Sequence, residues 1–136
     1  MRTAASPAGV RLARAHGLFN VLGGAWPLLR MRSFEAVTGP KADRWLVRTV
    51  SGLMVANGAV QLRAEPSQDG VTAARRIGMG TALVVATVDV VYGGRHRISR
   101  MYLVDAVLET GWLVAWARCA ASPGGDAAST GCGGGR

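Results

Sequence analysis

The sequence predicts an all-α fold, a single-domain bundle of four transmembrane helices. Of the 136 residues, 49% are hydrophobic and a further 19 are glycine. Charged residues make up 18%, which is below the roughly 25% typical of soluble domains. The apolar residues are gathered into four segments of about 15 to 18 residues, bounded by arginines and turn-forming residues. An unusually apolar soluble four-helix bundle is the alternative.

The first helix is predicted at residues 9–29. Its apolar stretch follows Arg11 and Arg14, an arrangement that also occurs in signal peptides. Asn20 and Pro27 interrupt the stretch, however, and no cleavage site of small residues follows it. We therefore interpret the segment as a helix that the protein retains.

The other three helices are predicted at residues 43–64, 71–92 and 98–118. Each apolar segment is slightly shorter than the roughly 20 residues that a membrane span needs. Arginine side chains at the segment ends can extend the helices, because their charged groups reach back to the interface. The first connection is long and holds the turn signal Gly39-Pro40, whereas the other two are short and polar.

Together the four helices make up a membrane domain at residues 9–118. Residues 1–8 are predicted to be a flexible N-terminus. Residues 119–136 are rich in glycine and cannot bury a core, so they are predicted to be a disordered tail.

Small and aromatic residues favour a membrane environment. Glycine weakens a helix in water by up to about 1 kcal/mol relative to alanine, but in a bilayer it lets helices approach closely. Trp26, Trp45 and Trp116 lie toward segment ends, as in an aromatic belt. We expect a multi-pass protein of the cell membrane whose partners are the lipid bilayer and other subunits, in a homo-oligomer or a larger membrane complex.

Arginine supplies 15 of the 16 basic residues, and this bias, with the many Ala, Gly and Val residues, suggests a GC-rich bacterial genome. The expected location is therefore a bacterial inner or plasma membrane. The net charge of +8 is spread over the segment ends, as expected for side chains among lipid headgroups. The basic residues divide evenly between the two sides, so the orientation of the termini stays open. No zinc-finger spacing, ribonucleoprotein motif or basic zipper is present, so nucleic acid is not an expected partner.

Few residues suggest chemistry. The two cysteines, Cys119 and Cys132, lack the spacing of a metal site or a disulfide framework. No nucleophile and base are recognisable as a set. We therefore predict no catalytic residue, no cofactor and no metal, and an enzymatic function is not favoured.

Four charged residues are predicted to form a buried polar cluster: Arg48, Asp89, Asp105 and Glu109. Helical geometry places the first three on inward faces within roughly 6 Å of one depth, with Glu109 deeper. Because a lone buried charge is costly, Arg48 is expected to pair with Asp105 or Asp89. One or two carboxyl groups then lack a cation and could carry a proton. The alternative is an ion-paired and hydrogen-bonded cluster whose role is purely structural, namely to fix the register of the helices.

His16 and Asn20 form a secondary polar face, nearer the opposite side of the bundle. His16 on a face of small residues is more typical of a packing residue than of a ligand. On the second helix, an inward Arg48 leaves Asn57 and Gln61 on the opposite side, toward another helix or subunit.

In its span number and length, and with Asp89 and Asp105 in the third and fourth helices, the chain resembles the small four-span bacterial membrane proteins grouped as DoxX-like. The resemblance covers residues 9–117. The segment 31–45 looks like a family signature loop, to which no activity can be attached. Some DoxX-like proteins are similar to subunits of quinone-linked respiratory or sulfur-oxidising complexes, but no residue of this chain carries that role over.

Two functions remain open at this level. The first is a structural or accessory subunit of a membrane assembly. The second is a transporter-like or proton-linked protein that uses the buried Arg/Asp/Glu cluster.

Overall fold

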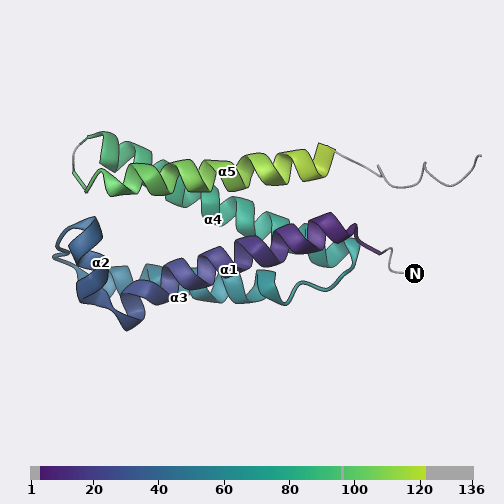
Figure 1. Ribbon diagram of the computed structural model, residues 1–136, viewed down its shortest axis with the longest axis horizontal. Helices are drawn as coiled ribbons and strands as arrows, with labels where there is room; N and C mark the ends of the chain where they lie inside the picture. Colours follow the sequence, from purple (N-terminus) through teal and green to yellow (C-terminus); the bar gives the residue numbers. More distant parts are fainter. Residues whose placement is uncertain (1–3, 96, 122–136) are drawn as a thin grey trace, which may run out of the picture.

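The computed structural model describes residues 4–95 and 97–121, and the regular elements in these ranges are α-helices joined by short connections (Figure 1). An isolated β-bridge between Ala4 and Ser67 is the exception within those ranges. The all-α class predicted from the sequence is therefore confirmed. In chain order the helices are α1 Pro7–Leu29, α2 Met31–Thr38, α3 Arg44–Leu62, α4 Gln68–Gly94 and α5 Met101–Ala121.

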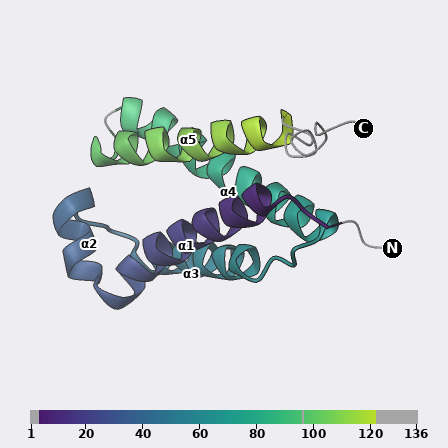
Figure 2. The ribbon, with the colours of Figure 1, turned by 45° about the vertical axis from the view of Figure 1, so that its right-hand side comes forward.

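The four long helices form two antiparallel pairs. α1 packs along α3, and α5 packs along the later part of α4 (Figures 1 and 2). α4 connects the pairs, because its first turns contact α3 and α1. The short helix α2 and the α4–α5 turn lie at one end of the molecule, which we call the α2 end. The start of α1, the α3–α4 turn and the end of α5 lie at the other end, which we call the turn end (Figure 1).

Local signals in the sequence begin two of the helices. The Ser6 hydroxyl oxygen accepts a hydrogen bond from the Gly9 amide at 3.2 Å, and Pro7 occupies the first turn of α1. The Ser67 hydroxyl oxygen accepts from the Gly70 amide at 3.1 Å at the start of α4. Both serines satisfy an amide that the helix itself leaves without a partner, and proline is favoured where no amide is needed.

Glycines bring α1 and α3 into backbone contact. A Cβ atom at Gly17 would lie 2.7 Å from the Gly58 carbonyl oxygen, and one at Gly58 would lie 2.6 Å from the Gly17 carbonyl oxygen. One heptad along, a Cβ at Gly24 would lie 2.6 Å from the Ser51 carbonyl oxygen. Side chains larger than hydrogen therefore cannot occupy these crossings without separating the helices.

The observed helices differ from the predicted ones mainly at their ends. Helix α2 was not predicted, and it occupies the connection that the turn signal marked. It ends at Gly39, whose positive φ of 84° is readily adopted by glycine. The N-terminal segment predicted to be flexible is partly ordered, since the Ala5 amide donates to the Pro66 carbonyl at 3.2 Å. Residues 1–3 and 122–136, including most of the predicted disordered tail, lie outside the described residues.

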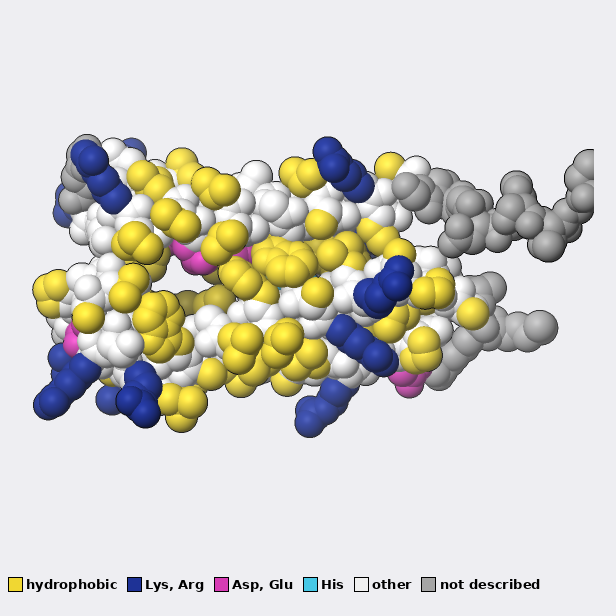
Figure 3. Space-filling model, viewed as in Figure 1, with side chains coloured by type: hydrophobic (Ala, Val, Ile, Leu, Met, Phe, Trp, Pro, Cys, Tyr) yellow, Lys and Arg dark blue, Asp and Glu magenta, His cyan; other side chains and the backbone are white. Residues whose placement is uncertain are grey.

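Polar side chains make up much of the interior. The largest fully buried side chains are Trp116, His16, Gln61, Glu109 and Asn20, and the buried hydrophobic residues other than Trp116 are all alanine. Large aliphatic side chains lie outside: Leu29, Val107 and Val84 are 79%, 71% and 64% exposed. Figure 3 shows Lys and Arg gathered toward the two ends of one face, with apolar side chains between them. Of the described helices, α4 alone is both long and apolar enough to be a candidate membrane span by length and composition.

Candidate functional site

Three carboxyl groups from α4 and α5 lie inside the bundle. Asp89 and Glu109 are buried, and Asp105 is half-buried. The Asp89 and Asp105 carboxyl groups lie close enough to each other to interact electrostatically. Asp105 and Glu109 are four residues apart, so they share one face of α5. The cluster therefore forms where the two helices of this pair meet.

Small residues on α4 create the space for these groups. The buried face of α4 consists of Gly78, Ala82, Ala86, Asp89 and Gly93 together with Ala74. A Cβ at Gly93 would lie 3.1 Å from a methyl carbon of Leu103 on α5. The residues beside Asp89 on this face are glycine or alanine, whose side chains are a hydrogen or a methyl group. Helix α5 can therefore approach α4 closely, and Asp105 comes near Asp89.

His16 of α1 extends the cluster toward the turn end. Its Nε2 lies 4.0 Å from Oε2 of Glu109, and both side chains are fully buried. Its ring stacks on Trp112 with centroids 4.6 Å apart and planes inclined by 7°. The Trp116 indole nitrogen donates a hydrogen bond to Nδ1 at 3.0 Å. Since Nδ1 accepts, the proton of the neutral ring is on Nε2 and faces Glu109.

Two further buried side chains beside His16 link α1, α3 and α4 by hydrogen bonds. The Asn20 amide nitrogen donates to the Gln61 side-chain oxygen at 2.8 Å, and the Gln61 amide nitrogen donates to the Ala74 carbonyl at 3.4 Å. Gly78 lets α4 approach both groups, because a Cβ there would lie 2.7 Å from His16 Nδ1 and closer still to the Gln61 amide nitrogen. A buried polar network thus crosses from α3 through α1 to α5.

Several buried atoms of the network have unused hydrogen-bonding capacity. Among the described residues, no hydrogen bond satisfies either carboxyl oxygen of Glu109, Oδ2 of Asp89, Nε2 of His16 or Oδ1 of Asn20. Buried polar atoms of native proteins are normally paired, and unpaired ones point to a bound species or to chemistry. Figure 3 also shows a hollow between the two helix pairs toward the α2 end, with acidic side chains at its edge.

Arg48 is the one predicted member of the cluster that the structure places elsewhere. It is exposed on α3, and no ion pair joins it to a carboxyl group in residues 4–95 or 97–121. The prediction that it pairs with Asp89 or Asp105 is therefore wrong. The crossing at Gly17 and Gly58 decides this, because it turns the small face of α3 inward and the Arg48 face outward.

The same rotation brings Gln61 inside, where it contacts Asn20 of α1, so the predicted alternative that it faces another helix holds. Asn57, predicted to lie on the same side as Gln61, donates to the Thr81 hydroxyl of α4 at 3.1 Å. The signal that could have found Gln61 is the heptad pair Ser51 and Gly58. That spacing marks the face of closest approach, and Gln61 lies one turn beyond it.

No protein-family model matches the chain, and no curated protein or solved structure matches it either. Its function is therefore inferred from the geometry of the cluster. In the described part of the chain, no three His, Cys, Asp or Glu side chains are arranged to hold a metal ion. The cluster consists of carboxyl groups and an imidazole, side chains that can each bind a proton.

Proposed function

We propose that this chain is an integral membrane protein in which α1, α3, α4 and α5 each cross the bilayer. The polar interior and aliphatic exterior support this proposal, because lipid tails solvate exposed leucine and valine at no cost. The helices contain 23, 19, 27 and 21 residues. At about 1.5 Å per residue each is about 28 Å long or more, close to the roughly 30 Å of a bilayer core.

Within that bundle, the cluster of Asp89, Asp105, Glu109 and His16 binds and relays protons. One observation carries this function: three carboxyl groups lie inside the bundle without an arginine or lysine partner in the described residues. Ionisable groups inside a membrane are costly, and they are retained where they serve ion or proton movement.

Three helices contribute the groups of the cluster. α4 contributes Asp89, α5 contributes Asp105 and Glu109, and α1 contributes His16. From the α2–α3 connection, Lys41 lies over the ring of Tyr102, 4.7 Å from its centroid, and donates to the Thr38 carbonyl. A proton accepted by the aspartate pair passes to the carboxylate of Glu109 on the next turn of α5. The Nε2–H of the neutral His16 ring faces that carboxylate, so His16 stabilises the ionised form of Glu109 and does not itself accept the proton there.

Proton flux into liposomes tests this function. The purified chain is reconstituted with a pH-sensitive dye inside, and a potassium gradient with valinomycin drives protons inward. We expect flux above that of protein-free liposomes, and loss of most of it in Glu109→Gln, Asp105→Asn and Asp89→Asn. Asp69→Asn is the matched control, because Asp69 is exposed in the first turn of α4. Folded variants that conduct like the unmodified chain would disprove the relay.

A second candidate is an accessory subunit of a membrane assembly, in keeping with the DoxX-like resemblance. Three outward glycines on three helices favour it: a Cβ at Gly52, Gly80 or Gly111 would meet nothing within 4 Å. Such positions let another helix approach closely. Light scattering of the detergent-solubilised chain, compared with the Gly52→Leu variant, tests for self-association at that surface.

A further inference from the structure

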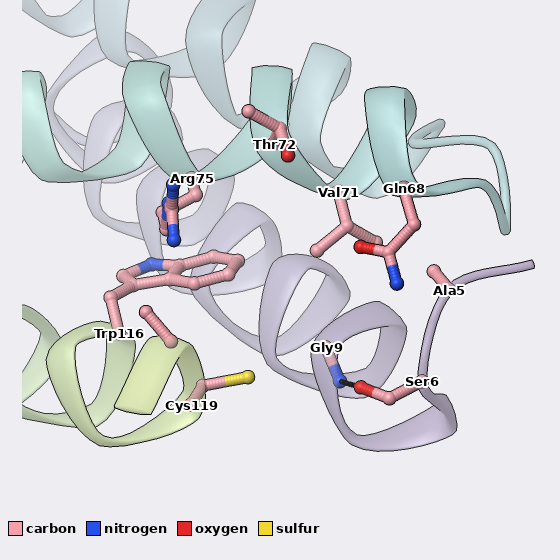
Figure 4. A pocket seen from close by; sticks show the side chains of 10 residues that line it. Ala5, Ser6, Gly9, Gln68, Val71, Thr72, Arg75, Trp116 and Cys119 are labelled. Atoms are coloured by element: carbon pink, nitrogen blue, oxygen red, sulfur yellow. Dashed lines mark hydrogen bonds between the residues drawn. The ribbon is translucent and has the colours of Figure 1, made fainter. Parts of the chain in front are cut away.

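A separate pocket opens at the turn end, away from the carboxyl cluster. It has a volume of about 230 Å³ and lies between the first turns of α1 and α4 and the last turns of α5. Polar side chains on its wall are Ser6, Gln68, Thr72 and Arg75, while Trp116 and Cys119 line it from α5 (Figure 4). Pockets for drug-sized ligands begin at about 300 Å³. This one therefore suits a small group or the headgroup of a larger molecule.

The chemistry of the wall favours an anion. Arg75 is half-buried and extends toward the Trp116 ring (Figure 4). Within the described residues its guanidinium has no hydrogen bond or ion pair, and no acidic side chain is among the lining residues. The hydroxyl of Thr72 adds a donor nearby. The amide nitrogen of Gln68 donates to the Ala4 carbonyl at 3.4 Å and carries a second N–H. A guanidinium with neutral donors around it is the arrangement that binds phosphate.

We propose that this pocket binds a phosphate group, with Arg75 as its main ligand. The apolar part of the wall, formed by Val71 and the Trp116 ring, continues from the polar part. An amphiphile could therefore place its phosphate on Arg75 and the start of its chain on these side chains. The phosphate can come from an anionic lipid headgroup or from the aqueous phase. The pocket is distinct from the proton relay, although Trp116 borders both.

Cys119 provides a direct readout of occupancy. In the Cys132→Ser chain, Cys119 is the remaining cysteine, so the rate of its reaction with an uncharged maleimide reports access to the pocket. The chain is placed in nanodiscs of phosphatidylcholine, of equal parts phosphatidylcholine and phosphatidylglycerol, or of phosphatidylcholine with inorganic phosphate. We expect labelling to slow several-fold with phosphatidylglycerol, or with phosphate if the free anion is the ligand.

Adjacent arginines give a matched pair of variants. Arg75 lines the pocket and Arg76 is exposed beside it. We expect Arg75→Gln to weaken anion binding about tenfold and to abolish the protection, because a charged hydrogen bond is lost. Arg76→Gln carries the same change in net charge and keeps the protection. Thr72→Val, which changes no charge, gives a partial loss if Arg75→Gln does not fold.

The labelling rates distinguish the two possible sources of the phosphate and can also overturn the proposal. Protection by phosphatidylglycerol alone identifies a lipid headgroup, and protection by inorganic phosphate identifies a soluble anion. Equal protection in all nanodiscs, or equal loss in Arg75→Gln and Arg76→Gln, overturns the proposal. Failure of the proton-flux experiment leaves this result unaffected, because neither arginine belongs to the carboxyl cluster.

Discussion

At the scale of the residue, the side chains around His16 determine what the buried network can do. Trp112 stacks on one face of the imidazole, and Trp116 donates to Nδ1. The remaining nitrogen must then point its proton toward Glu109 at 4.0 Å. Trp116 is therefore a positioning residue that sets the tautomer of His16. The sequence pattern is typical of a packing role for His16, whereas the structure makes it part of the buried polar network.

Trp116→Phe tests this role. The change keeps an aromatic ring but leaves Nδ1 of a fully buried histidine without a donor. We expect the free energy of unfolding to fall by about 1–2 kcal/mol, because a buried acceptor loses its hydrogen bond. In a His96→Asn background, nitrogen NMR should show one His16 tautomer in the unmodified protein and a mixture in the variant.

Trp45→Phe is the control, since Trp45 is 67% exposed and should tolerate the change with little effect on stability. An unchanged tautomer in Trp116→Phe, with stability equal to that of the control, would show that Trp116 does not position His16.

At the scale of the element, glycine spacing sets the contact between α1 and α3. Gly17 and Gly24 on α1 face Gly58 and Ser51 on α3, so each helix repeats its small residues every seven positions. That contact rotates α3 and thereby buries Gln61 and exposes Arg48. The apolar segments predict the four long helices. They do not predict the inward face of α3, because the charged Arg48 lies on its outward face.

Gly17→Ala should destabilise the fold, because the added Cβ would lie 2.7 Å from the Gly58 carbonyl oxygen and 2.8 Å from the Leu62 amide nitrogen. These are backbone atoms, so the helices must separate. We expect a loss of about 1–3 kcal/mol in an unfolding titration with sodium dodecyl sulfate. Gly52→Ala meets open space and should be neutral or slightly stabilising. Similar losses in both variants would contradict the close crossing.

An ion pair between α2 and the first residue of α3 holds the connection between α1 and α3 together. Arg44 donates two hydrogen bonds to Glu35, at 2.9 and 2.6 Å, and the Lys41 amide donates a third. Mainly through the bonds from Arg44, the pKa of Glu35 is lowered. Glu35 is 11% exposed and Arg44 55%, so the pair lies at the surface.

Acid should open this connection. Because the folded-state pKa of Glu35 lies below its unfolded value, its contribution to stability is present above the unfolded pKa and is lost as pH falls through the folded pKa. Hydrogen exchange at Lys41 should therefore accelerate at acidic pH beyond the intrinsic rate change. Glu35→Gln should remove this dependence, and a pH response that persists in Glu35→Gln would assign it to another group.

At the scale of the whole molecule, polar side chains lie in the interior and large aliphatic side chains lie on the outside. Polar groups and alanine fill the interior, valine and leucine cover the outside, and charges gather toward the ends (Figure 3). The two ends also differ, because α2 and the α4–α5 turn lie at one end and the α3–α4 turn lies at the other (Figure 1). A membrane-spanning bundle would place these two ends on opposite sides of the bilayer.

Fractionation and cysteine labelling test that arrangement in cells. After a carbonate wash, we expect the chain to stay in the membrane pellet. With both native cysteines changed to serine, single cysteines are introduced as Ala42→Cys at the α2 end and Arg63→Cys at the turn end. An impermeant maleimide should label one of them in intact cells and both after detergent is added. Labelling of both in intact cells, or release by carbonate, would contradict a spanning bundle.

The all-α class, the four long segments and the inward position of Asp89 follow from the sequence, because apolar runs and helical spacing are local properties. The sequence also indicated that Asp89 and Asp105 lie at one depth, since helical rise converts position into height. Only the tertiary structure decided that His16 and Gln61 join the network and that Arg48 leaves it. The rotation of one helix against another depends on contacts between residues far apart in the chain, and no local pattern encodes it.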